Sequence, residues 1–443
     1  MTNKTHYMIS STQKFKMALL LFMSATIFLL SCNKNVEQFA EPPVTPPGTG
    51  LTLGETLAGT ATDSLYYRLV VQGGMLPVIS DKAASYTLFV PNNNAMKGFI
   101  YAISGGLVPL AAPDAVFSGF ISANIPPATA AGIVGYNIVA QSLPSASIPA
   151  TFPNFQYPTI LNPAPAVSAL LRLTTFPTTR NGAWVNNVPL IAVDAMAVNG
   201  LIHHTAAVVV PPQHFLWDRI NTDTKLTYLK AAIIRADSGT AAPGTLQGAL
   251  LNIGANLTVF APTDSAFKAI ITAVAYKTLL PLVVQQLTAA YVNAGVPPTD
   301  AAALAAANAP AITITKATAL ASSPTVFSNP ALFGVLTAQL VKGIVVYHIM
   351  GNRAFTNNFP TTATAYPTLL NRAIPAHPGI TLTAVFGFPF VSSATVKGAV
   401  NATASNIIIN ASPLLPDPVG TSDQHYLNGV LHKIDQVLLP LPF

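Results

Sequence analysis

Cysteine and charge are what this 443-residue chain has least of. Cys32 is its only cysteine, and charged residues make up 8% of the sequence, about a third of the usual quarter. A folded part that follows Cys32 therefore has no disulfide, no thiolate metal site and no cysteine nucleophile. The polar part of its surface must therefore consist mainly of uncharged side chains. The hydrophobic residues, 51% of the sequence, suffice for sizeable cores.

Clusters of basic residues and enzyme motifs are also missing from the sequence. The formal charge of +6 includes three lysines before residue 17, and the other basic residues are dispersed singly, which excludes nucleic acid as a partner. The sequence has no GxSxG, HExxH, Walker loop or GxGxxG, and its acids and histidines show no spacing typical of a metal site. We therefore predict a protein that is not an enzyme and needs no metal or cofactor. The alternative that the protein is an enzyme, such as an esterase or glycosidase, would require a pair of carboxylates in a pocket.

The N-terminus is typical of a lipoprotein signal peptide at residues 1–31. Lys14 and Lys16 precede an apolar run at 17–30, which has signal-peptide length and is too short to span a ~30 Å hydrocarbon core. The run ends in Leu-Leu-Ser before Cys32, which resembles the bacterial lipobox, where the cysteine is acylated and becomes the new N-terminus. We predict lipidation of Cys32 and anchoring in a lipid membrane through it. The alternative is an ordinary secretory peptide that ends at a cysteine.

Residues 32–52 are rich in proline, glycine and polar residues, which predicts an extended tether between membrane and folded part. Asn33 is not the aspartate that resembles an inner-membrane retention signal. We therefore expect a membrane-anchored lipoprotein of the cell envelope, located in the outer membrane.

Three sequence landmarks occur twice in the same order and indicate a duplication. Residues 87–96 (TLFVPNNNAM) match 258–267 (TVFAPTDSAF), residues 132–138 match 343–349, and residues 199–211 match 428–440. We predict two tandem domains, the first at 53–211 and the second at 212–443.

The second copy carries about 40 extra residues, in an Ala-rich, nearly uncharged insertion around 271–330. A helix over 301–309, capped by Thr299 and Asp300, is predicted there, although the 38 prolines of the chain argue against long helices. Insertions in compact domains are commonly functional. We expect this segment to form part of a contact surface; the alternative is that it enlarges the core.

Local patterns around the landmarks predict an α+β fold of short strands and helices. The apolar run at 257–261 is a strand stopped by Pro262, and Thr263 can then cap a helix. The two Asn-Gly pairs predict tight turns that lead into apolar strands. The Gly-Ile-Val-x-Tyr runs predict buried strands or the ends of buried helices.

The landmarks resemble the fasciclin domain family. The second copy has the Thr-Val-Phe-Ala-Pro-Thr-Asp box, the pair Tyr347-His348 and the closing Asn-Gly-x-x-His run at 428–440. The first copy departs from the family pattern, because Asn137 stands at the position of the central histidine and Met96 at that of the box phenylalanine. The resemblance implies two compact α+β wedges of short strands packed with helices, in a family whose members are typically extracellular adhesion or matrix-binding modules.

Tyr347 and His348 are the candidate binding residues, because the resemblance associates this pair with partner binding in some animal adhesion proteins. The alternative is structural, since the apolar residues before the pair imply that at least one side chain points inward. For His203 and His432, which follow the two Asn-Gly turns, we predict buried, hydrogen-bonded roles. An aromatic platform for a sugar ring, made of Phe155, Tyr157 and Trp184, stays open beside a core role.

These observations together predict a cell-envelope lipoprotein that adheres, or binds an extracellular protein or glycan, through its fasciclin-like domains. The alternative is an accessory glycan-capture lipoprotein of an outer-membrane uptake system. Self-association through the Ala-rich insertion is also open.

Overall fold

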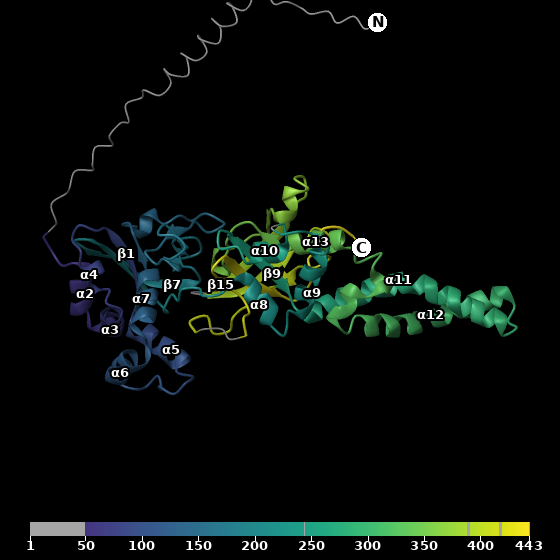
Figure 1. The fold of residues 1–443 in the computed structure, drawn as a ribbon, viewed down its shortest axis with the longest axis horizontal. Coiled ribbons are helices and arrows are strands. Elements are labelled where there is room, and N and C mark those ends of the chain that lie inside the picture. Colours follow the sequence, from purple (N-terminus) through teal and green to yellow (C-terminus); the bar gives the residue numbers. More distant parts are fainter. Residues whose placement is uncertain (1–48, 243, 388–389, 416–418, 443) are drawn as a thin grey trace, which may run out of the picture. The chain divides into compact units, whose positions relative to one another are not determined.

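The computed structural model describes residues 49–242, 244–387, 390–415 and 419–442 (Figure 1). The predicted signal peptide, Cys32 and most of the tether lie outside these residues. The first helix of the described residues, α2 (Leu53–Gly59), begins where the folded part was expected. Thr52 is its N-cap, and the Thr52 hydroxyl accepts a hydrogen bond from the backbone N–H of Glu55.

The first domain packs helices against a sheet with the strand order β2-β1-β8-β7-β6-β5. Its helices are α2, α3 (Ser64–Gln72), α4 (Leu76–Ile79), α5 (Asn93–Ile103), α6 (Asp114–Asn124) and α7 (Pro127–Tyr136). Its strands are β1 (Tyr86–Pro91), β2 (Ile138–Val139), β3 (Tyr157–Pro158), β4 (Thr174–Thr175), β5 (Pro177–Thr178), β6 (Trp184–Val185), β7 (Val188–Ala197) and β8 (Gly200–Thr205).

The second domain repeats this core arrangement, with a sheet ordered β10-β9-β16-β15 and a second sheet ordered β11-β12-β13-β14. Its helices are α8 (Leu216–Thr222), α9 (Thr227–Ala236), α10 (Leu246–Leu250), α11 (Asp264–Asn293), α12 (Pro298–Leu320) and α13 (Ala338–Tyr347). Its strands are β9 (Leu257–Pro262), β10 (Ile349–Met350), β11 (Thr364–Tyr366), β12 (Ile380–Gly387), β13 (Phe390–Lys397), β14 (Ser405–Asn406), β15 (Gln424–Tyr426) and β16 (Gly429–Ile434).

Each domain has at its centre a parallel pair of strands formed by its first and last landmarks. β1 pairs with β8, and β9 pairs with β16 in the same register. A Cβ on Gly200, whose φ is +147°, would lie 2.0 Å from the carbonyl oxygen of Tyr86, and one on Gly429 would lie 2.5 Å from that of Leu257. The Asn-Gly turns therefore need glycine because the neighbouring strand passes too close for any side chain. The predicted α+β fold in two tandem domains that share one core arrangement is thus confirmed.

The central landmarks are helix ends. α7 ends at Tyr136 and α13 ends at Tyr347, and each is followed by a two-residue strand that pairs antiparallel with β1 or β9. This decides between the two structures that the sequence left open for these runs.

The insertion contradicts the expectation of short helices. α11 runs for 30 residues with Pro281 inside it, and α12 runs for 23 residues with Pro310 inside it. Both prolines lie on exposed positions, so the carbonyl groups that lose their helical partner can be hydrated, and packing of one helix on the other stabilises both. The Thr263 side chain does not cap α11, although its backbone takes the N-cap position. The predicted helix over 301–309 is real but makes up only part of the N-terminal half of α12.

The two domains meet at a junction made of amide side chains and aromatic rings. Nδ2 of Asn358 donates to the carbonyl oxygen of Thr151 at 2.9 Å, and Nδ2 of Asn357 donates to that of Asn186 at 3.1 Å. Asn357 and Asn358 are buried, and these hydrogen bonds give their Nδ2 groups the partners that water cannot supply there. A small buried cluster spans the junction, made of Phe176, Phe355 and Val430. The boundary predicted between residues 211 and 212 lies in the connection from β8 to α8 and stays a prediction.

Candidate functional site

Tyr347, at the end of α13, is fully buried. Its hydroxyl donates to the carbonyl oxygen of Gly379 at 2.5 Å and accepts from the backbone N–H of Ala399 at 2.8 Å. Its ring meets that of His377 edge-on, with 5.0 Å between the centroids. Burial raises the pKa of Tyr347, so the hydroxyl stays protonated. Tyr347 therefore joins α13 to the start of β12 and to the chain beyond β13.

His348 follows as the C-cap of α13 and is also buried. Its Nδ1 lies 2.8 Å from the carbonyl oxygen of Ile344, and its Nε2 lies 2.8 Å from the backbone nitrogen of Leu438. Because a backbone N–H can only donate, Nε2 is the unprotonated nitrogen, and the proton on Nδ1 is donated to Ile344. Burial lowers the pKa of His348 to about 4, so the imidazole is neutral at physiological pH.

The first domain makes equivalent contacts with an amide. Nδ2 of Asn137 donates to the carbonyl oxygens of Ile133 at 2.8 Å and Val209 at 2.9 Å. Ile133 stands four residues earlier, as Ile344 does before His348, and Val209 lies in the closing apolar segment of its domain. Asn137 thus ties a helix end to the last segment of the domain without any imidazole.

The surroundings of Tyr347 and His348 do not favour the predicted binding role. Both side chains lie inside the second domain with their polar atoms hydrogen-bonded, so the geometry supports the structural alternative. A direct contact with a macromolecular partner would require this part of the core to open. A binding role for the pair stays a prediction.

The histidines after the Asn-Gly turns lie inside the two cores, as predicted. Nε2 of His203 lies 2.9 Å from the carbonyl oxygen of Leu143, and Nε2 of His432 lies 2.9 Å from that of Ala354. Each ring stacks on a phenylalanine at a centroid distance of 5.7 Å. Burial lowers the pKa of both histidines. Within the described ranges, no group of three or more His, Cys, Asp or Glu side chains could hold a metal ion.

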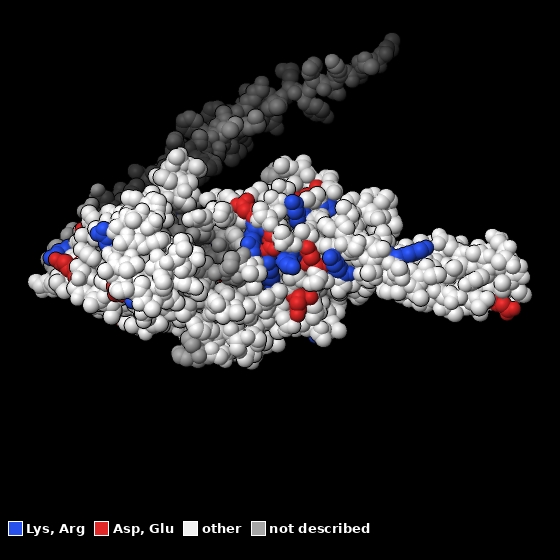
Figure 2. Space-filling model, turned by 90° about the horizontal axis from the view of Figure 1, so that it is seen from below, with Lys and Arg blue, Asp and Glu red and all other residues white. Residues whose placement is uncertain are grey.

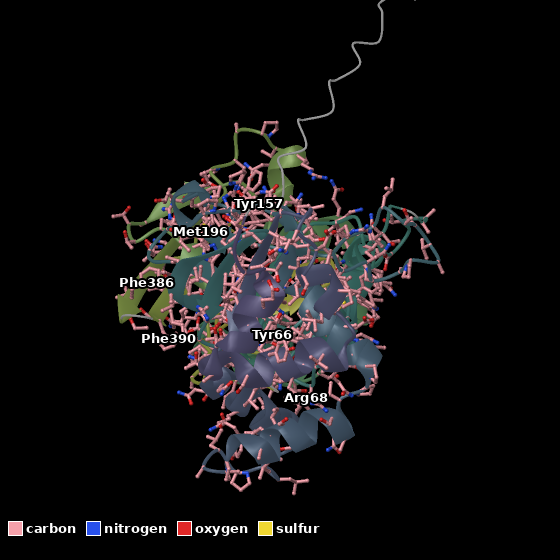
Figure 3. All side chains as sticks on the ribbon, turned by 90° about the vertical axis from the view of Figure 1, so that its left-hand side faces the viewer. Tyr66, Arg68, Tyr157, Met196, Phe386 and Phe390 are labelled. Atoms are coloured by element: carbon pink, nitrogen blue, oxygen red, sulfur yellow. The ribbon has the colours of Figure 1, made fainter. Side chains whose placement is uncertain are left out.

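The aromatic platform that the sequence left open does not form. Phe155 and Tyr157 pack together, with 5.1 Å between their ring centroids. Trp184 is buried and instead meets Phe390 of the second domain at 6.5 Å, and Figure 3 shows Tyr157 and Phe390 far apart. Phe155 is the exposed member of this set, and a single ring is not a platform.

The hairpin of α11 and α12 is the largest feature that distinguishes the second domain from the first. The two helices lie side by side and extend away from the sheets (Figure 1). On α12, the residues that pack inward recur every four positions and are small: Ala301, Ala305, Ala309, Thr313 and Ala317. Such a stripe lets two helices approach closely.

The outer surface of this hairpin is apolar and almost without charge. Between Lys277 and Lys316 the sequence has one charged residue, Asp300, and Figure 2 shows the hairpin end nearly free of charged atoms. α11 is long and apolar enough to cross a membrane, yet only 28% of its most apolar window is buried. The exposed large apolar side chains are Leu282, Val292, Leu304, Ile312 and Ile314. The sequence predicted the position and composition of this segment, but not that it projects as a hairpin.

Two sets of residues had no counterpart in the sequence analysis. The junction amides, such as Asn357 and Asn358, have no motif, because their partners are about 170–210 residues away along the chain. Arg353 is buried at the same junction. Its position in the first copy is taken by the exposed Ser142, so the duplication gave no signal for it.

Comparison with known proteins places the first domain. Residues 63–211 match the family model of the fasciclin domain. Among solved structures, a FAS1 domain pair from the insect cell adhesion molecule fasciclin I is similar at 13% identity, over 85% of this chain and 97% of that one, with a TM-score of 0.29. No curated protein matches. Fasciclin domains are generally adhesion or binding domains. The chain therefore contains a fasciclin domain at residues 63–211, followed by a second domain that repeats its strand order.

Proposed function

We propose that this protein is a lipid-anchored adhesion protein of the cell envelope, in which the α11–α12 hairpin makes the adhesive contact. The observation that carries the proposal is the exposed, uncharged apolar surface of the hairpin. Exposed large apolar side chains gathered on one hairpin, with almost no charge among them, are typical of a surface that an interaction covers. The anchor would be an acylated Cys32 in the outer membrane.

The partner we propose for this surface is the same hairpin on a second copy of the protein. A surface whose only charge between Lys277 and Lys316 is Asp300 cannot select a partner by complementary charge. It requires a partner that is equally apolar, and the hairpin itself meets this requirement. The exposed alanines of α12, such as Ala302, Ala303 and Ala306, would allow close helix packing between two copies.

The adhesive role is tested by adding charge to the hairpin without changing its interior. Leu304 and Ile312 are 44% and 37% exposed, so the double variant Leu304→Glu/Ile312→Glu should fold normally. We expect it to abolish self-association in sedimentation experiments and clustering of beads coated with the protein. The matched control is Leu170→Glu in the first domain, which is 89% exposed and should leave both unchanged. Self-association that the double variant leaves intact would refute the hairpin contact.

Salt gives a second test of the same contact. Association through uncharged apolar surface should persist or strengthen as salt is raised, whereas a contact made by exposed charges weakens. Loss of association in high salt would contradict an apolar interface.

The anchor is tested separately with Cys32→Ser. This variant should leave residues 49–443 folded but release the protein from membranes, because acyl chains supply the attachment. Variant protein that still pellets with membranes after a high-salt wash would show that another element, such as α11, provides the attachment.

A cavity in the second domain supports glycan capture as the second candidate function. A space of about 560 Å³ lies between α9 and the segment 324–333, within the size range of ligand sites. Hydroxyl and amide side chains share its lining with Phe327 and Phe333. A glycan array probed with the full chain and with Phe333→Ala distinguishes the two functions, since adhesion through the hairpin does not depend on Phe333.

A further inference from the structure

Arg353 is a buried cation without an anionic partner. Its side chain is 4% exposed, and it takes part in none of the ion pairs formed among the described residues. Burial lowers its pKa to about 10, so the guanidinium is still charged at neutral pH. Removing a charge from water costs several kcal/mol unless an opposite charge or hydrogen bonds compensate.

The protein compensates this charge only with neutral acceptors. Nε donates to Oδ1 of Asn256 at 2.9 Å, Nη2 donates to the carbonyl oxygen of Leu427 at 2.6 Å, and Nη1 lies 2.5 Å from Nε2 of His425. The ring of Phe176 lies 5.0 Å from the guanidinium carbon, which adds a cation–π contact. These three hydrogen bonds use three of the five N–H groups of a guanidinium, and the full positive charge remains.

Arg353 lines a small polar cavity at the junction of the two domains. The cavity measures about 150 Å³, enough for several water molecules or one small organic anion. The first domain contributes Gln156, Arg172 and Thr174, and the second contributes Asn256. No Asp or Glu belongs to its lining within the part of the chain that the structure describes.

Arg172 supplies a second positive charge at this cavity. Its Nη1 donates to the carbonyl oxygens of Ala169 and Leu171, so its side chain is oriented, and it remains exposed. One buried and one exposed guanidinium, with amide donors nearby, form a preferred environment for an oxyanion. Ser142, the counterpart of Arg353 in the first domain, lies at an exposed position, so this environment exists only where the two domains meet.

We propose that the cavity between Arg172 and Arg353 binds a small carboxylate, either free or as the acid group of a sugar. The carboxylate would neutralise the buried guanidinium and accept hydrogen bonds from both arginines. Because residues of both domains line the cavity, the bound acid would also stabilise the junction. This site is separate from the hairpin, and its occupancy does not depend on adhesion.

The test uses isothermal titration of the full-length protein at low ionic strength with acetate, galacturonate and neutral galactose. We expect acetate or galacturonate to bind and galactose not to bind. Tighter binding of galacturonate than of acetate would assign the ligand to acidic sugars, and equal binding would assign it to free carboxylates. Charge-assisted hydrogen bonds are worth roughly 1.5–3 kcal/mol, so Arg353→Met should weaken binding about tenfold or more.

Arg172→Glu is the second variant, because Arg172 is exposed and its replacement leaves the buried junction intact. It should also abolish binding, by placing a negative charge at the cavity. The matched control is Arg68→Ala on α3 (labelled in Figure 3), a partly exposed arginine bonded to Ser122, which should bind like the parent. Absence of saturable binding of both acids at millimolar concentrations, or unchanged binding by Arg172→Glu, would overturn the proposal.

Discussion

The two domains place different side chains at the same structural position, and the difference shows what the position does. After the central tyrosine, the first domain has Asn137 and the second has His348. Each ties the C-terminal end of a helix to the closing segment of its domain. Because an amide fulfils the role in one copy, the imidazole in the other need not be there for chemistry or recognition.

The copies differ most where the chain leaves the shared sheet. The second domain inserts α11 and α12, and it buries Arg353 where the first exposes Ser142. The shared positions hold the fold, while the positions that differ carry the surfaces and cavities that we propose to be functional. This is the expected distribution when a scaffold is duplicated and one copy is elaborated.

The largest loss of stability is expected from substitutions at Gly200 and Gly429, the glycines at which β8 and β16 begin. Gly200→Ala should cost about 3–5 kcal/mol, because it adds strain at positive φ to a clash with the backbone of β1. Gly429→Ala should cost less, about 1–3 kcal/mol, because overpacking alone applies there. Denaturant unfolding of the two variants measures both. Equal costs would show that the backbone conformation of Gly200 adds nothing.

The next largest effect is expected from acid, which should unfold the two domains at different pH values. The pKa of His348 is about 4 when folded and near 6.5 when unfolded. Between these values the unfolded chain binds more protons, so the free energy of unfolding falls as the pH is lowered from about 6.5 to about 4. This histidine alone accounts for about 3 kcal/mol. The lowered pKa values of His425 and His432 act in the same direction.

In the first domain burial lowers the pKa of His203, whereas in the second it lowers those of His348, His425 and His432. The second domain should therefore unfold at a higher pH than the first. The two tryptophans, Trp184 and Trp217, report on one domain each when the other is replaced by phenylalanine. Coincident acid transitions in Trp184→Phe and Trp217→Phe would contradict the difference.

Replacing His203 or His432, whose rings stack on phenylalanines, should lower the stability of the two domains by similar amounts. His203→Ala and His432→Ala each leave a buried backbone carbonyl and a partly buried backbone N–H without their partner, which lowers the free energy of unfolding by about 1–3 kcal/mol. Thermal unfolding followed through the tryptophan of the same domain measures each loss. A variant with unchanged melting temperature and lost binding would make that histidine functional instead.

Exchanging Asn137 and His348 should give unequal results. An amide has both a donor and an acceptor, so His348→Asn can still donate to Ile344 and accept from Leu438, at a cost of less than about 1 kcal/mol. Asn137→His should cost about 1–3 kcal/mol at neutral pH, because a neutral imidazole cannot donate to both Ile133 and Val209. His348→Asn should also remove part of the acid sensitivity of the second domain. An acid transition that does not move would locate that sensitivity in other groups.

The sequence predicted those parts of the fold that depend on local pattern. The Asn-Gly turns, the apolar strands after them and the buried histidines follow from residues close together in the chain. The length of α11 does not follow from local pattern. By local propensity a helix should end before Pro281, but packing against α12 overrides this preference. The Arg353 cavity was hidden for a similar reason: residues 156–174, 253–256 and 353 become neighbours only after both domains have formed.

The smallest difference concerns the caps of two equivalent helices. Asn92 caps α5, with its Oδ1 accepting from the backbone N–H of Ala95 at 3.0 Å. Thr263 occupies the same position before α11, but its hydroxyl contacts the hydroxyl of Ser265 and no helical N–H. Removing a capping side chain costs about 1 kcal/mol, so Asn92→Ala should lower the stability of the first domain by that amount.

Thr263→Ala should change the second domain by less than about 0.5 kcal/mol, the usual range for a surface substitution away from such features. The N-terminus of α11 is held instead by Asp264, whose carboxylate accepts from the backbone N–H of Tyr228 at 3.0 Å and from the hydroxyl of Thr227 at 2.7 Å. Denaturant unfolding, with the tryptophan of each domain as probe, resolves differences of this size. A loss near 1 kcal/mol for Thr263→Ala would show that its hydroxyl caps α11 in solution, and the two domains would then begin these helices in the same way.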